Sequence, residues 1–204
     1  MGEHLYTYID PPNSRHLDQI VDVLRRGGLI ALSTGTSWAF CVDPSSKKAL
    51  ERLVRLKPNH PEGLPFSLIC RDISMASTVA TIVGRSYRYL HRLLPGPYTV
   101  LLYSQKKLPK LLGSRRSTVG VRIPQAPLCQ AIIERFGSPL LVSSVPPGPQ
   151  GVLTMGWEVH EAHGQALDYV VDLGDELPGA KTTVIDLRMG DPVVVRQGVG
   201  KLPV

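Results

Sequence analysis

Apolar residues recur along this chain with two alternating periods, one typical of helices and one typical of short buried strands. Apolar positions 17, 20, 21 and 24 share one helical face, and Asn13 or Ser14 can cap the helix that they predict. Gly27 and Gly28 can end this helix by adopting left-handed backbone angles. The apolar run at 29–32 then predicts a buried strand.

The same alternation continues toward the C-terminus. Ser45 or Ser46 can cap a second helix whose inward positions are Leu50, Leu53 and Val54. Further strands are expected at 37–42, 66–70, 98–103, 118–123, 139–143, 169–172, 182–187 and 192–196. Further helices are expected at 74–83, 86–94, 127–136 and 158–165, and the Pro- and Gly-rich stretch 146–156 predicts a loop. This order buries a sheet between helices, so we expect an α/β fold with a twisted, open, mixed sheet flanked by helices.

The composition is that of a globular protein. The chain has 204 residues, of which 43% are hydrophobic and 20% are charged. We expect a single domain over residues 1–204. No apolar run approaches the roughly 18 residues of a membrane span, and no signal segment opens the chain. We therefore expect a cytoplasmic protein with no membrane partner.

The three cysteines, Cys41, Cys70 and Cys129, are odd in number and far apart. This spacing predicts neither a disulfide framework nor a metal site with close ligands. Free cysteines favour protein cores, so we expect buried, reduced thiols.

A formal net charge of +6 is compatible with a polyanionic partner such as RNA or a nucleotide. Two clusters of basic residues carry much of this charge: Arg85, Arg88 and Arg92 in the first, and Lys106, Lys107, Lys110, Arg115 and Arg116 in the second. We find no regular alternation of basic and aromatic residues in either cluster. A solvated helix face and a charged loop therefore remain open as alternatives.

Five short segments occur in a fixed order that is more informative than any one of them. They are Ser33-Thr34-Gly35-Thr36, then Lys57, then Pro95-Gly96-Pro97-Tyr98-Thr99, then Val121-Arg122-Ile123-Pro124, and last Thr182-Thr183-Val184-Ile185-Asp186 followed by Arg196-Gln197-Gly198. With a Ser143-Ser144 pair before the last segment, this order resembles the YrdC/YciO family of threonylcarbamoyl-AMP synthases and double-stranded-RNA-binding proteins, and is closest to its YciO branch. The resemblance extends from about Asp18 to Gly200 and implies a YrdC-like fold with a concave site.

Some of the family's polar positions are kept and others are altered. Where the family has P-T-D-T, Thr34 and Thr36 remain, but Gly35 replaces the acidic residue. Lys57 matches the lysine of the family's K-x-R signature, whereas the arginine position falls on Asn59 or His60. Neither offers a permanent charge with two parallel donors, so this role would fall to one of the nearby arginines, Arg52, Arg55 or Arg71.

The later motifs are better preserved. Arg122 lies among apolar strand residues and needs a partner if it is buried, either an internal carboxylate or a ligand. Ser144, preceded by Ser143, matches the serine of the family's S-A-N signature, with Pro146 in place of the amide. The remaining matches are Thr182 and Thr183 in the family's P-S-T-V turn, and Arg196 in its closing R-x-G.

The resemblance implies a reaction in which L-threonine, bicarbonate and ATP form threonylcarbamoyl-AMP for transfer to tRNA. It implies Lys57, Arg122 and Arg196 as catalytic phosphate or carboxylate partners, and Thr34, Thr36, Ser143, Ser144, Thr182 and Thr183 as substrate- or nucleotide-binding residues. ATP with magnesium would be a substrate, and we expect no protein metal site and no tightly bound cofactor. The altered positions leave two hypotheses open: a weak nucleotidyltransferase of the threonylcarbamoyl-AMP synthase type that also binds double-stranded RNA or tRNA, or a non-catalytic RNA-binding or regulatory protein.

Overall fold

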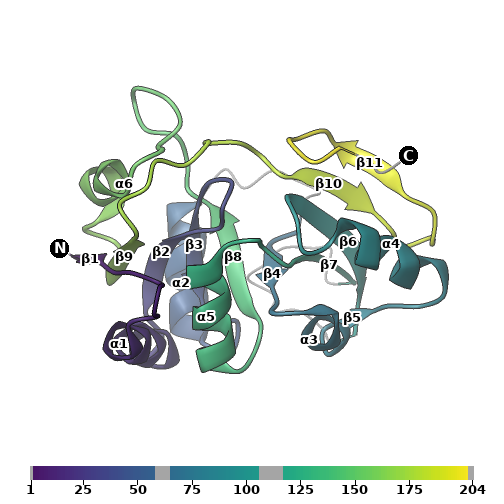
Figure 1. Ribbon diagram of the computed structural model, residues 1–204, viewed down its shortest axis with the longest axis horizontal. Coiled ribbons are helices and arrows are strands. Elements are labelled where there is room, and N and C mark those ends of the chain that lie inside the picture. The colour runs from purple at the N-terminus through teal and green to yellow at the C-terminus, as the bar shows by residue number, and fades with distance from the viewer. Residues whose placement is uncertain (1, 58–64, 106–116, 202–204) are drawn as a thin grey trace.

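The computed structural model describes residues 2–57, 65–105 and 117–201 (Figure 1). Its helices are α1 (Ser14–Arg25), α2 (Lys47–Leu56), α3 (Ile73–Ser77), α4 (Arg85–Leu93), α5 (Pro127–Phe136) and α6 (Gly156–His163). Its strands are β1 (Glu3–Tyr6), β2 (Leu29–Ser33), β3 (Trp38–Val42), β4 (Ser67–Ile69), β5 (Ala80–Thr81), β6 (Tyr98–Ser104), β7 (Thr118–Arg122), β8 (Leu140–Ser144), β9 (Tyr169–Asp172), β10 (Thr183–Asp186) and β11 (Val193–Arg196). In the described residues these strands form one mixed sheet in the order β1-β9-β2-β3-β8-β4-β7-β6-β10-β11, with β5 paired to β6.

Helices cover both faces of this sheet, as the apolar pattern predicts. Figure 1 shows α1 and α5 side by side in front of β2, β3 and β8, with α2 behind these strands. Ile30 and Leu32 face the core under α1 and α5, whereas Leu29 and Ala31 face the core under α2. A strand buried on both faces has no polar side, which is why residues 29–32 form a continuous apolar run.

The first helix illustrates how local sequence sets an element. The Asn13 side chain accepts a hydrogen bond of 3.2 Å from the backbone N–H of His16, so Asn13 is the N-cap. All four predicted inward positions are buried, namely Leu17, Ile20, Val21 and Leu24. After the helix, Gly27 adopts a left-handed φ of +77°, whereas Gly28 does not. The expected α/β class and mixed sheet are confirmed.

The helix expected at 74–83 is wrong beyond residue 77. In its second half, Ala80 and Thr81 form β5 and pair with Ser104 and Tyr103 of β6. The Thr78 hydroxyl donates to the Met75 carbonyl at 2.8 Å, so a side chain supplies a hydrogen bond to one of the last carbonyl groups of the helix. The β-branched residues at 78, 79 and 81–83 favour extended backbone, which outweighs the helical spacing of their apolar positions.

Strand β1 was not expected from the sequence, because only four residues form it and its partner β9 lies more than 160 residues away. The three cysteines are buried and free, as expected. In the described residues no helix is both long and apolar enough to cross a membrane. The basic cluster at 106–116 lies outside the described residues.

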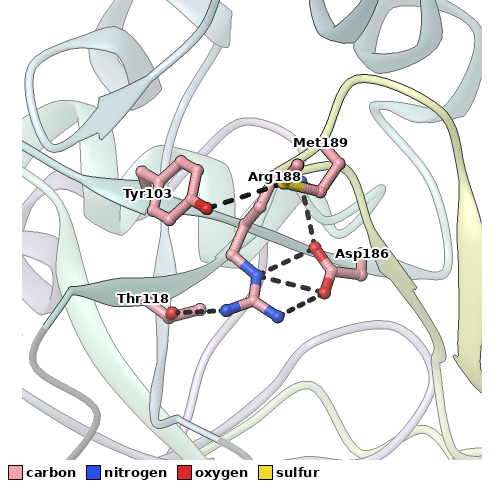
Figure 2. A network of polar contacts seen from close by, with 5 residues as sticks. All are labelled: Tyr103, Thr118, Asp186, Arg188 and Met189. Atoms are coloured by element: carbon pink, nitrogen blue, oxygen red, sulfur yellow. Dashed lines mark hydrogen bonds and ion pairs between the residues drawn. The ribbon is translucent and has the colours of Figure 1, made fainter.

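An ion pair fastens the end of β10 to its neighbours (Figure 2). The Arg188 guanidinium donates to the Asp186 carboxylate at 2.6 Å and to the Thr118 hydroxyl of β7 at 3.1 Å. It also lies 5.9 Å from the ring centre of Tyr103 on β6. Hydrogen bonds from Arg188 hold the pKa of Asp186 below its ordinary value of 3.8. The network therefore joins three adjacent strands at the end of β7 opposite Arg122.

We expect Asp186→Asn to lower the free energy of unfolding at pH 7 by about 1–2 kcal/mol, because Arg188 loses its charged acceptor. Folding lowers the pKa of Asp186, so the carboxylate stabilises the folded state. Its contribution to the free energy of unfolding is complete above pH 3.8 and is lost as the pH falls through the lowered pKa. Urea unfolding of wild type and variant at pH 7 and at about pH 2.5 measures this difference. Asp191→Asn is the control, because its pair with Arg85 is 66% exposed on both sides and contributes little. An equal effect of the two substitutions at pH 7 would contradict the prediction.

Candidate functional site

The turn between β2 and β3 holds the Ser33–Thr36 segment, and the Thr34 hydroxyl connects it to β7. Thr34, which is only 2% exposed, donates from Oγ1 to the Ser37 carbonyl at 3.0 Å. The same oxygen accepts a hydrogen bond of 3.0 Å from Nη2 of Arg122. The Thr36 hydroxyl is buried and has no partner among the described residues. One threonine of the turn is thus bonded to a buried arginine, and the other has an unused hydroxyl.

Gly35 gives this turn its shape. Its φ is +83°, in the left-handed region that glycine adopts without strain. A Cβ at this position would lie 3.3 Å from the backbone carbonyl of Gln125, in the loop that follows Arg122. The residue that replaces the family's acid therefore allows the turn to pack against the loop beyond β7.

Arg122 ends strand β7 and is only 6% exposed. Its Nε has no partner, and in the described part of the chain no carboxylate forms an ion pair with it. Burial lowers the pKa of Arg122 to about 10, the nearby Cys129 opposes this shift, and the positive charge of Arg196 adds to it. The internal carboxylate left open by the sequence is therefore absent from the residues that the structure describes.

Arg196 comes from the last strand and reaches the same region. Its Nη2 donates to the Thr182 carbonyl at 3.0 Å, and its Nε is buried without a partner in the described structure. Burial also lowers the pKa of Arg196. The Thr182 hydroxyl lies 2.9 Å from that of Thr99, which belongs to the Pro95–Thr99 segment. Three motifs from β6, β10 and β11 are thereby brought together around Arg196.

Thr183 has a different environment from Thr182. It is fully buried, donates to the Gly200 carbonyl at 2.7 Å and accepts from the Gly198 N–H at 2.9 Å. Both functions of its hydroxyl are therefore occupied within the protein. Thr183 holds the C-terminal loop in place, whereas Thr182 faces Arg196.

Lys57 lies at the C-terminal end of α2 and contacts the end of β8. Its Nζ donates to the Ser144 carbonyl at 2.9 Å, and partial burial lowers its pKa. Ser144 is exposed, whereas Ser143 is buried on the other side of the strand. The N–H of Val145 donates to the Trp38 carbonyl at 3.0 Å, so the end of β8 lies directly beside the Thr34 turn. The turn is therefore next to Arg122 and to the end of β8 that Lys57 contacts.

The segment from β9 to β10 completes the arrangement. It crosses the upper edge of the sheet in Figure 1, and the N–H of Ala180 donates to the Thr36 carbonyl at 2.9 Å. Hydrogen bonds thus join Thr34 to Arg122, Thr182 to Arg196, and Lys57 to Ser144, whereas Ser143 is buried on the other face of β8 and Thr183 bonds to the C-terminal loop. Asn59 and His60, at the altered K-x-R position, lie outside the described residues.

His163, at the end of α6, was not selected from the sequence as a site residue. Its ring packs edge-on against Phe40 with 5.3 Å between ring centres, and its Nε2 is buried without a partner in the described structure. Burial lowers its pKa, a bond to the Pro146 backbone raises it, and the charge of Lys57 lowers it again. The spacing of His160 and His163 in the sequence gives no indication that His163 lies near Lys57. Only the fold shows that these two residues are neighbours.

The described residues include no group of three or more His, Cys, Asp or Glu side chains able to hold a metal ion. The polar groups that converge near the Thr34 turn are instead guanidinium, ammonium and hydroxyl groups. These are the donors that bind phosphate and carboxylate oxygens.

Comparison with known proteins gives a consistent result. The family model Sua5_yciO_yrdC, described as "Telomere recombination", matches residues 22–198. The chain is 35% identical over 202 residues to the "Uncharacterized protein YciO" of Escherichia coli K12, covering 98% of this chain and 97% of that protein. It is 31% identical over 181 residues to the threonylcarbamoyl-AMP synthase of Chromohalobacter salexigens, covering 85% and 95% of the two chains. The crystal structure of E. coli YciO superimposes with a TM-score of 0.90 at 34% identity and covers 98% of both chains.

Proposed function

This chain belongs to the Sua5/YciO/YrdC family, and on that premise we propose that its Arg122–Arg196 cluster binds the anionic groups of a nucleotide and an amino-acid substrate. The family includes threonylcarbamoyl-AMP synthases, which connects it to tRNA modification. We further propose that the protein is a slow enzyme of this type, using ATP, L-threonine and bicarbonate.

The buried guanidinium of Arg122 carries this proposal. An ionised group removed from water is strongly destabilising unless charged or hydrogen-bonding partners compensate it. Arg122 has one hydroxyl partner, Thr34, and a second positive charge nearby on Arg196. A phosphate or carboxylate between the two guanidinium groups would supply the missing negative charge and use the free Nε of each.

The same cluster favours a small anion over a nucleic-acid duplex. Duplex RNA is bound through its phosphates by basic groups spread over an accessible surface. Arg122, at 6% exposure, is too buried to reach such a backbone. Double-stranded RNA binding therefore finds no support in these two arginines.

The proposed chemistry assigns simple roles to the residues present. The threonine amine and bicarbonate form a carbamate with loss of water, and a carbamate oxygen then attacks the α-phosphorus of ATP. The bond from that phosphorus to the β-phosphate oxygen breaks, and pyrophosphate leaves. Arg122, Arg196 and Lys57 would stabilise the developing charge, while the Thr36 hydroxyl, which has no protein partner among the described residues, would orient the substrate. Magnesium would enter with the nucleotide, held by phosphate oxygens.

The altered positions predict a low rate. Gly35 has no carboxylate, and Pro146 lacks the amide expected there, so two hydrogen-bonding groups are absent from the site. Loss of a single electrostatic group at a transition state lowers the rate by on the order of a hundredfold or more.

We expect threonylcarbamoyl-AMP formation at a rate at least about a hundredfold below that of a synthase with all motifs intact. The measurement is release of pyrophosphate together with detection of the mixed-anhydride adenylate, with bicarbonate omitted as the control. A rate equal to that of the intact synthase would contradict the role given to the altered positions. Tight ATP binding without any adenylate would favour the non-catalytic alternative.

Two substitutions test the altered K-x-R position directly. Asn59→Arg and His60→Arg each place a guanidinium at one of the two alignments, and one of them is expected to raise the rate about tenfold or more. Lys48→Gln, on the exposed side of α2, serves as a surface control. No increase in either variant would mean that a missing arginine does not limit this reaction.

A further inference from the structure

A groove lies between α3 and α4, and its lining includes Pro95 and Ile123 from two of the motif segments. It has a volume of about 620 Å³, which is within the range of ligand-binding pockets. Its floor is apolar and includes Ile82, Leu94 and Ile123, and its rim is polar, with Tyr87 and His91 along one side. The groove therefore offers an apolar floor beside groups that can stack and donate hydrogen bonds.

This groove lies on the opposite face of β7 from Arg122. Val119, Val121 and Ile123 pack in the core under α3 and α4, whereas the Arg122 side chain contacts Thr34. Successive residues of a strand point to opposite faces, so a ligand in the groove cannot contact Arg122. The groove and the Arg122 side chain therefore lie on opposite faces of β7.

Two aromatic rings on α4 form the wall of the groove. Tyr87 and His91 lie one turn apart, with ring centres 4.5 Å from each other and an angle of 70° between the rings. Both side chains are exposed, Tyr87 to 51%. Aromatic side chains held at a surface in this way are the groups on which unpaired nucleobases stack.

A row of positive charge runs parallel to these rings. Arg88 and Arg92 each follow one of the aromatic residues, so they occupy the neighbouring face of α4, again one turn apart. Both are exposed and form no ion pair among the described residues, whereas Arg85 pairs with Asp191. Helix α4 contains no acidic residue. The alternation of aromatic and basic residues that was not expected from the sequence is therefore present in this cluster, as the pairs Tyr87-Arg88 and His91-Arg92.

The one carboxylate in the groove is already neutralised. Asp72 accepts from Nε of Arg71 at 2.9 Å and from the backbone N–H of Met75 at 2.7 Å. Its charge is therefore balanced within the rim and does not repel an anion on α4. The exposed charges that remain beside the aromatic wall, on Arg88 and Arg92, are positive.

We propose that this groove binds single-stranded RNA, with one unstacked base against Tyr87 and His91 and the flanking phosphates on Arg88 and Arg92. Charge complementarity favours an anionic chain, and the aromatic wall favours bases that are free to leave a stack. A duplex keeps its bases stacked and hidden, so it cannot use the groove. An acidic peptide would use the arginines without needing the rings.

The test uses the full chain and a fluorescein-labelled 12-nucleotide RNA of mixed sequence without secondary structure. Fluorescence anisotropy is expected to show that Tyr87→Ala combined with His91→Ala weakens binding about tenfold or more. Arg88→Gln combined with Arg92→Gln is expected to weaken binding and to reduce the slope of log K against log salt by about 1.4, since each single-strand phosphate contact contributes roughly 0.7. The matched control is Arg15→Gln combined with Arg25→Gln, which removes two exposed charges from α1.

A second measurement locates the RNA without relying on affinity. The same RNA carrying 4-thiouridine, irradiated in the complex, should crosslink to peptides of α3 or α4. Equal binding by the Tyr87–His91 double variant, crosslinks elsewhere, or tighter binding of a duplex of the same length would overturn the proposal. Binding of an acidic peptide that is lost only in the arginine variant would also overturn it. Loss of ATP binding in an Arg122 variant leaves this test unaffected, because that side chain faces the other side of β7.

Discussion

Replacing Arg122 by methionine is expected to weaken ATP binding by about a hundredfold or more while leaving the protein at least as stable as the wild type. An arginine that serves the fold has a carboxylate partner, and its removal destabilises the protein. Arg122 has none among the described residues, and burial lowers its pKa from 12.5 to about 10. Because the folded-state pKa is the lower one, the charge opposes folding at every pH below about 10, and this opposition fades as the pH rises above that value. Methionine removes the opposing charge and keeps the apolar part of the side chain.

Arg52→Met is the matched control, because Arg52 is an arginine with protein partners. It donates to the Asp168 carboxylate at 2.6 Å and to the Ala166 carbonyl at 2.8 Å. Its loss is expected to lower the free energy of unfolding by about 1.5–3 kcal/mol without changing ATP binding. Isothermal titration calorimetry and urea unfolding measure the two quantities. If Arg122→Met destabilised the protein as much as Arg52→Met and left ATP binding unchanged, Arg122 would be a structural residue.

The second large effect is expected at Gly198, the glycine of the closing R-x-G motif. A Cβ at this position would lie 2.2 Å from the Lys181 carbonyl oxygen and 2.4 Å from the Thr182 carbonyl carbon. Both are backbone atoms and cannot move aside as a side-chain end can. Gly198→Ala must therefore separate the loop from residues 181–182, which breaks the bond from Gly198 to Thr183 and shifts Arg196 away from Thr182.

We expect Gly198→Ala to lower the free energy of unfolding by about 1–3 kcal/mol and to weaken ATP binding together with stability. Val199→Ala is the control in the same loop, because that side chain is 50% exposed. Thermal unfolding and ATP titration of both variants give the comparison. Normal stability and binding in Gly198→Ala would show that this loop can move without disturbing Arg196.

Local sequence was sufficient to predict most of the secondary structure. Helix α5, from Pro127 to Phe136, and strand β9, from Tyr169 to Asp172, have the expected bounds. Their apolar spacing, and the proline in the first turn of α5, are signals contained within each segment. The failures came where a distant partner decides the conformation, as in β5, which pairs with Tyr103 and Ser104 at the end of β6 that extends beyond the pairing with β10.

The order of motifs along the sequence identified the family. The retained threonines, lysine and arginines gave the candidate residues of one site. The apolar residues around Arg122 in its strand also indicated that this arginine needs a partner if it is buried. The sequence could not identify the groups around Arg122, because they lie more than 70 residues away along the chain. Thr34 accepts a hydrogen bond from Arg122, and Arg196 places a second positive charge nearby.

The sequence by itself determined most of the elements, the family and the residue types of the site, because these follow from periodicities and motifs within short segments. Only the tertiary structure decided how each polar group is used. It used the Thr183 hydroxyl to hold the C-terminal loop and left Arg122 and Arg196 close together without a carboxylate among the described residues. It also placed Tyr87 and His91 at the groove between α3 and α4. The physical reason is that hydrogen-bond satisfaction and charge compensation depend on distances in space, which the strand order of the sheet sets and the spacing along the chain does not.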